Sequence, residues 1–138
     1  MKRLLLFLVL AALSVSCSKL RSVKGLSTEP ATWTKPGTWY GRTGTAVTIQ
    51  MKGGTDQFKS AHAVTFRFDG GLPHGPKGGQ WGTIFDYTVP VLKREPHALT
   101  LFFWNGDPTN KDVLEELPNQ VKAGTLVVIP CIPERVCG

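Results

Sequence analysis

Short apolar stretches with strand periodicity, separated by glycine and proline turns, constrain this chain to a mostly β fold. In residues 46–51 and 63–69 every second side chain is apolar, as in a strand with one buried face. Residues 83–92 repeat this alternation, and Pro90 within them predicts an edge strand or an early end. Residues 98–104 are almost continuously apolar, which is typical of a central strand covered on both faces.

A last strand is expected at residues 125–129, and one short helix precedes it. Asp107 or Thr109 is placed to cap this helix, and Pro118 is expected to end it after Leu117. Strands at such short spacing with one brief helix predict a single small antiparallel β-sandwich or barrel. The length of 138 residues agrees, since a chain of this size buries one hydrophobic core.

The N-terminal sixteen residues have the three-part layout of a secretory signal peptide. A positively charged start at Lys2 and Arg3 is followed by an unbroken apolar run at 4–13, and small residues lead up to Cys17. The run is too short for a transmembrane helix, which needs about 20 apolar residues. We therefore expect residues 1–16 to be removed when the protein is exported.

Residues 13–17, with the sequence Leu-Ser-Val-Ser-Cys, resemble the lipobox of bacterial lipoproteins. In that class a diacylglycerol is attached to the cysteine thiol, and cleavage leaves the cysteine as the new N-terminus. The resemblance implies a lipid anchor at Cys17 in the cell envelope, and Ser18 after it favours the outer membrane. Ser14 occupies the position where leucine is preferred. Cleavage after Ser16 to give a secreted or periplasmic protein is therefore the alternative.

The cysteine count supports the anchor, because three cysteines leave one without a disulfide partner in an exported chain. If Cys17 carries lipid, Cys131 and Cys137 remain to form a disulfide, which persists in an oxidising compartment. Closing so short a loop contributes about 2–3 kcal/mol in the chain-entropy model. Redox-active or metal-binding thiols are the alternative, but the spacing is not C-x-x-C and no histidine lies near in sequence.

Composition and local pattern divide the exported chain into a tether and a domain. Residues 17–38 are polar and irregular, so we expect a lipidated N-terminus and a flexible tether there, with the β domain at 39–138. The formal charge of +6 is carried by scattered basic residues, and only Lys93 and Arg94 of the domain are adjacent. This pattern gives no basic stripe and argues against a nucleic-acid partner.

The Gly- and Pro-rich loop at residues 70–82 is the most unusual segment of the predicted domain. Long irregular loops often carry function, and the glycines allow close backbone contact with a ligand. His74, Lys77 and Trp81 are its candidate binding residues. The alternative is an exposed connection that Trp81 anchors in the core.

Aromatic and acidic side chains supply two further candidate surfaces. A stacking face for a glycan or a protein is one interpretation of the aromatic residues, and burial in the core is the other. These residues are Trp33, Trp39, Tyr40, Trp81 and Trp104. The acidic group is interpreted as a solvated helix face or a docking surface. It consists of Asp107, Asp112, Glu115 and Glu116.

The sequence contains no recognisable catalytic or metal-binding motif. There is no G-x-S-x-G motif, and the three histidines stand apart, so we expect no metal or other cofactor. Asp69, Asp86 and Glu95 are the carboxylates that a glycoside hydrolase would pair. The preferred hypothesis is a non-enzymatic, membrane-anchored module that binds another envelope protein or a glycan. A small hydrolase using His74 and a carboxylate, or an inhibitor acting through residues 70–82, are the alternatives.

The lipid anchor predicts the effect of one substitution. Cys17→Ser removes the thiol that would carry the diacylglycerol, so the variant is expected to leave the membrane fraction. Fractionation of cells expressing both forms, with mass spectrometry of the mature N-terminus, measures the outcome. A variant that still sediments with membranes contradicts the anchor.

Overall fold

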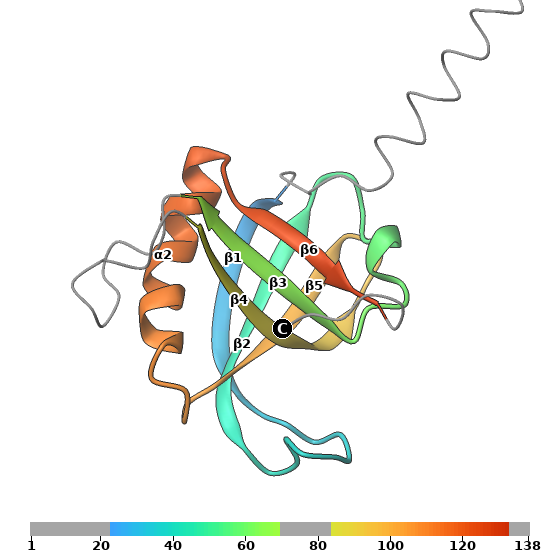
Figure 1. Cartoon of the computed structure of the whole chain (residues 1–138). Coiled ribbons are helices and arrows are strands. Elements are labelled where there is room, and N and C mark those ends of the chain that lie inside the picture. Colours follow the sequence, from blue (N-terminus) through green and yellow to red (C-terminus); the bar gives the residue numbers. More distant parts are fainter. Residues whose placement is uncertain (1–22, 70–83, 133–138) are drawn as a thin grey trace, which may run out of the picture.

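Six strands pair into one antiparallel sheet in the order β1-β2-β5-β4-β3-β6 (Figure 1). This computed structural model describes residues 23–69 and 84–132. One α-helix and one short 3-10 helix accompany the sheet within that part of the chain. The elements are β1 (Val23–Thr32), β2 (Thr43–Met51), η1 (Asp56–Phe58), β3 (Ala63–Asp69), β4 (Ile84–Arg94), β5 (Ala98–Trp104), α2 (Asn110–Ala123) and β6 (Val127–Cys131). The predicted mostly β antiparallel domain with one helix is confirmed.

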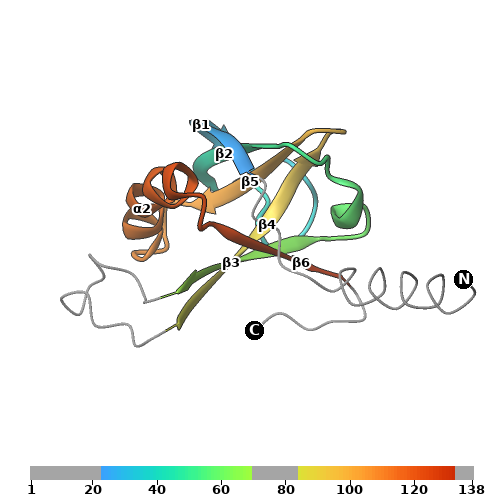
Figure 2. The same ribbon diagram turned by 90° about the horizontal axis from the view of Figure 1, so that it is seen from above.

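The long strand β4 joins the two halves of the sheet. Its first part, up to Pro90, pairs with β3, whereas its last residues pair with β5 from Val91 onward. The register shifts between Val91 and Lys93, which marks a bulge. The halves β1-β2-β5 and β4-β3-β6 therefore diverge from this shared strand and enclose the core between them, with α2 packed alongside (Figure 2).

The change of partner explains why Pro90 lies inside a strand. The expected early end is wrong, because β4 continues to Arg94. The expected edge position holds only locally, because β4 lies between β3 and β5 in the sheet but Pro90 itself pairs with β3 alone. Pro90 has no amide hydrogen to donate, and it lies where β4 stops pairing with β3 and starts pairing with β5. The next amide, that of Val91, donates to the carbonyl of His62 at 2.9 Å.

Apolar side chains from both halves and from α2 form one core. Phe103 of β5 stacks on Phe66 of β3 and on Tyr87 of β4, with ring centroids 6.1 and 5.8 Å apart. Val113 and Leu117 of α2 are fully buried against this cluster. Residues 98–104 form β5 as predicted, and its middle five residues are buried on both faces of the sheet.

The first strand lies within the segment 17–38 that was predicted to be a flexible tether. Residues 23–32 form β1, which pairs with β2 along its length, so the folded region does not begin near Trp39. Most side chains of β1 are exposed, and Val23, at 9% exposed, is its only buried residue. An edge strand stabilised mainly by backbone pairing needs little apolar alternation, and the sequence pattern of β1 is correspondingly weak.

The prediction that Pro118 ends the helix after Leu117 is wrong, because α2 passes through Pro118 and ends at Ala123. Pro118 removes only the amide that would bond to the carbonyl of Leu114, and the helix continues on either side of it. Gly124 ends the helix in a left-handed conformation with φ of 71°. At the other end Thr109 is the N-cap residue but makes no side-chain capping hydrogen bond, so the predicted cap is not formed. Asp107 instead accepts a hydrogen bond of 2.9 Å from the backbone amide of Thr109, in the turn before the helix.

Close contact between β2 and β5 predicts a large cost for one small substitution. A Cβ atom at Gly44 would lie 2.1 Å from the carbonyl oxygen of Phe103, so Gly44→Ala must separate the strands. We expect a loss of about 3 kcal/mol in the free energy of unfolding, measured by urea denaturation. Gly53→Ala is the matched control, because no atom lies within 4 Å of the added Cβ there. Equal stability of the two variants would contradict this packing.

Candidate functional site

The segment between β1 and β2, residues 33–42, folds back over the outer face of the sheet; we call it the tryptophan loop. Trp33 and Trp39 pack on Phe102 of β5, with ring centroids 5.4 and 6.2 Å from the phenyl ring. The amide of Trp33 donates to the carbonyl of Arg42 at 2.9 Å, which closes the loop. Phe102, which faces away from the main core, is therefore buried beneath the loop.

Arg42 fixes the outer side of this aromatic group. Its guanidinium lies 5.0 Å from the ring centroid of Trp39 and 4.3 Å from that of Trp104. The two indole rings meet edge to face at 5.8 Å. Cation–π contacts of this kind hold planar groups in place at a partly exposed surface.

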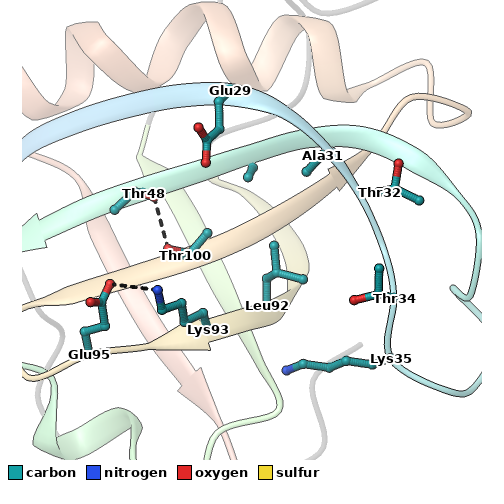
Figure 3. Close-up of a pocket in the computed structure, with 11 residues that line it drawn as sticks. Glu29, Ala31, Thr32, Thr34, Lys35, Thr48, Leu92, Lys93, Glu95 and Thr100 are labelled. Carbon is teal, nitrogen blue, oxygen red and sulfur yellow. Dashed lines mark hydrogen bonds and ion pairs between the residues drawn. The ribbon is translucent and has the colours of Figure 1, made fainter.

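A groove of about 520 Å³ lies beside the tryptophan loop on the outer face of the sheet (Figure 3). Its floor contains the hydroxyls of Thr48 and Thr100, whose oxygens are 3.0 Å apart across β2 and β5. Glu29 of β1 lies on one side of the groove, and Lys35 of the tryptophan loop and Lys93 of β4 lie on the other (Figure 3). We call this polar hollow the threonine groove.

A second hollow of about 450 Å³ adjoins the threonine groove, and Lys35 and Lys93 line both of them. Trp33 and Trp39 form part of its wall, so we call it the tryptophan cleft. Its remaining lining comes from Ala61, His62, Pro90, Val91 and Arg94. Both volumes fall in the range of about 300–1,000 Å³ that is usual for small-molecule sites.

Local contacts position the basic groups of the tryptophan cleft. The Lys35 ammonium lies 5.5 Å from the ring centroid of Trp33 and donates to the carbonyl of Val91 at 3.5 Å. Arg94 donates to the hydroxyl of Thr55 at 3.2 Å. Lys93 lies 3.7 Å from Glu95. Both side chains of this ion pair are at least half exposed, so it restrains Lys93 only weakly.

The structure brings together three of the five aromatic residues singled out in the sequence. Trp33, Trp39 and Trp104 share the cluster on the outer face of β5, whereas Tyr40 is 69% exposed beside it. Trp81 lies outside the described residues. The candidate loop residues His74 and Lys77, and the whole segment 70–82, also lie outside them.

The predicted carboxylate pairing is not formed by Asp86 and Glu95. Asp86 receives two hydrogen bonds of 2.8 Å from Arg67 on the neighbouring strand. Glu95 follows the far end of β4, up to about 30 Å away along an extended strand. Glycoside hydrolases hold their two carboxyl groups within about 10 Å. The side chain of Asp69 is not among those described.

Histidines and cysteines form no metal centre in the described part of the chain, where no group of three potential ligands occurs. His62 lines the tryptophan cleft, while His97 is exposed near Gly54. Cys131 ends β6 with its sulfur buried 3.4 Å from the hydroxyl of Thr65. Cys137 lies outside the described residues, so its pairing with Cys131 stays a prediction.

The acidic residues near α2 do not form one solvated face as expected. Glu116 is buried and accepts hydrogen bonds from the side chains of Asn119 and Gln120, at 3.3 and 2.9 Å. Asp107 accepts a bond of 2.7 Å from the hydroxyl of Tyr87. Both carboxylates therefore fix the helix locally, and only Glu115 of the group is fully exposed.

Tyr87 and Asp107 have the appearance of an acid–base pair, but their environment opposes that chemistry. Burial raises the pKa of the Tyr87 phenol far above its ordinary value, and the hydrogen bond to Asp107 and the charge of that carboxylate raise it further. The phenol therefore stays protonated at neutral pH and acts as a donor that ties β4 to the start of α2.

A third hollow, of about 460 Å³, lies between β1 and α2. Leu26 of β1 faces Leu114 and Pro118 of the helix across it, and both leucines pack against the main core. This hollow is the seam along which the helix packs on the edge strand, and its lining carries one lysine and one glutamate.

No protein-family model, curated protein or solved structure matches the chain. Among the residues that the structure describes, no helix is long and apolar enough to cross a membrane.

The bond between Tyr87 and Asp107 predicts a loss of stability in alkali. Because the folded state raises the pKa of Tyr87 above its ordinary value of 10.0, the stability that the bond contributes is complete below about pH 10. It is lost as the pH rises further. We expect Tyr87→Phe to cost about 1–2 kcal/mol at neutral pH and to reduce the decline above about pH 10.

Urea denaturation at several pH values measures this difference. Tyr40→Phe is the matched control, because Tyr40 is the other tyrosine of the protein and is exposed. If both variants show the alkaline decline of the unmodified protein, the assigned role of Tyr87 is wrong.

Proposed function

We propose that this protein is a non-enzymatic binding module of the cell envelope, and that the threonine groove with the tryptophan cleft binds a glycan. The observation that carries the proposal is the pairing of a polar floor with aromatic walls on one concave surface. Sugar rings present hydroxyls at their edges and apolar C–H groups on their faces. Hydroxyl and charged side chains suit the edges, and indole rings suit the faces.

The floor of the groove is rigid enough for such recognition. Thr48 and Thr100 lie on β2 and β5, which are paired inside the sheet, and their hydroxyls bond to each other. Trp33 is held on Phe102, and Arg42 holds Trp39. Side chains fixed before binding lose little conformational entropy when a ligand arrives.

A binding role is preferred to the hydrolase alternative because of where the carboxylates lie. Asp86 is paired with Arg67, and Glu95 follows the opposite end of β4. The alternative then depends on His74 and on loop residues outside the described part of the chain. The inhibitor hypothesis depends on the same segment, 70–82, and remains the second candidate.

The export signal and the lipid anchor at Cys17 belong to this proposal. Since β1 begins at Val23, only residues 18–22 separate the domain from the anchor instead of the longer tether first expected. Such a chain spans at most about 20 Å when fully extended. The domain would thus stay close to the membrane, with the outer membrane preferred and a secreted or periplasmic form as the alternative.

Removing the two hydroxyls of the floor tests the proposed site. The double variant Thr48→Val, Thr100→Val preserves side-chain shape. It removes both bonded hydroxyls together, so no buried hydroxyl is left without a partner and the fold should persist. We expect its affinity for envelope glycan fractions to fall about tenfold or more, as measured by isothermal titration calorimetry.

The sheet offers a matched control. Thr65 and Thr88 form the same cross-strand pair on β3 and β4, with hydroxyl oxygens 2.8 Å apart. Thr65→Val with Thr88→Val should leave glycan affinity unchanged. Equal losses in both double variants would contradict the assignment of the site. If the protein captures an envelope protein and binds no glycan, the proposed ligand is wrong and the site binds a protein.

A further inference from the structure

The two hollows of the binding surface differ in charge. Glu29 and Glu95 balance Lys35 and Lys93 in the threonine groove. The lining of the tryptophan cleft contains Lys35, Lys93 and Arg94 together with His62, and it contains no carboxylate. An elongated ligand that crosses both hollows therefore passes from a balanced surface to a positive one.

The cations of the tryptophan cleft come from two elements of the structure. Lys35 belongs to the tryptophan loop, whereas Lys93 and Arg94 lie at the end of β4. Lys35 is held near Trp33, and Arg94 is held by Thr55. Positive groups that converge on one hollow from two elements favour an anion within it, since each raises the local potential.

The aromatic wall restricts the kind of anion. Both tryptophans line the cleft beside the cations. Trp33 is only 7% exposed and supports the wall, whereas the half-buried Trp39 offers the indole surface that a ligand can reach. A small inorganic anion makes no use of an indole face, whereas a ring that bears an acidic group uses both features. The Thr48 and Thr100 hydroxyls next to the cleft suit further hydroxyl-bearing units of the same chain.

We propose that the ligand is an acidic saccharide, with a sugar ring against Trp39 and its carboxylate or phosphate among Lys35, Lys93 and Arg94. The neighbouring neutral units lie in the threonine groove. This inference rests on the proposed glycan-binding function and specifies the class of glycan. It makes binding dependent on ionic strength, because exposed cations are screened by salt.

Matched neutral and acidic probes test the inference on the purified protein. A disaccharide of one uronic acid and one neutral hexose, and its methyl ester, have similar shapes but differ in charge. A hexose phosphate and the unphosphorylated hexose form the second pair and distinguish phosphate from carboxylate recognition. We expect at least one acidic probe to bind about tenfold or more tightly than its neutral partner, and added salt to reduce that preference.

Charge-removing variants assign the preference to the tryptophan cleft. Lys35→Gln combined with Arg94→Gln should reduce affinity for the acidic probe about tenfold or more and change the neutral affinity little. Lys122→Gln is the control, because Lys122 is an exposed residue of α2 outside both hollows. Circular dichroism verifies that each variant is folded.

The outcomes separate this inference from the general proposal. If the neutral probes bind as tightly as the acidic ones, the inference is wrong and the glycan-binding function stands. If no saccharide binds at any salt concentration, both proposals fail. Tighter binding of a single-stranded oligonucleotide or of anionic lipid vesicles would also overturn the inference, because basic and aromatic groups together suit those ligands too.

Discussion

The division of β4 between two partners is the constraint on which the other features of the domain depend. One strand pairs with β3 over its first part and with β5 over its last, and a bulge near Lys93 changes its direction. The sheet consequently closes over a single core instead of remaining flat. Pro90 suits this place because it lacks the amide that a continuous central strand would use.

This bend also creates the surface that we assign to binding. The end of β4 brings Lys93 and Arg94 into the lining of the tryptophan cleft, together with residues of the tryptophan loop. The loop covers Phe102 and leaves hollows on either side of Lys35. The site therefore combines strands that are distant in sequence, with the threonine pair of β2 and β5 as its fixed floor.

Local pattern identified the buried strands better than the edge and the helix end. Residues 63–69 and 98–104 have the predicted bounds, because burial requires apolar side chains at a strand spacing. β1 was missed because an edge strand depends on backbone pairing, which leaves little trace in side-chain type. Pro118 was expected to stop the helix, but packing of residues such as Leu117 against the core stabilises α2 beyond it.

Residue type and spacing were enough to predict the fold class and to identify the tryptophans as candidate binding residues. The positions of Lys35, Arg94 and the pair Thr48 and Thr100 around adjoining hollows follow from the tertiary structure. These residues come from the tryptophan loop and three different strands. Their proximity results from the strand order, the register and the bend in β4. These depend on pairing between residues far apart in the sequence, which a local pattern does not predict.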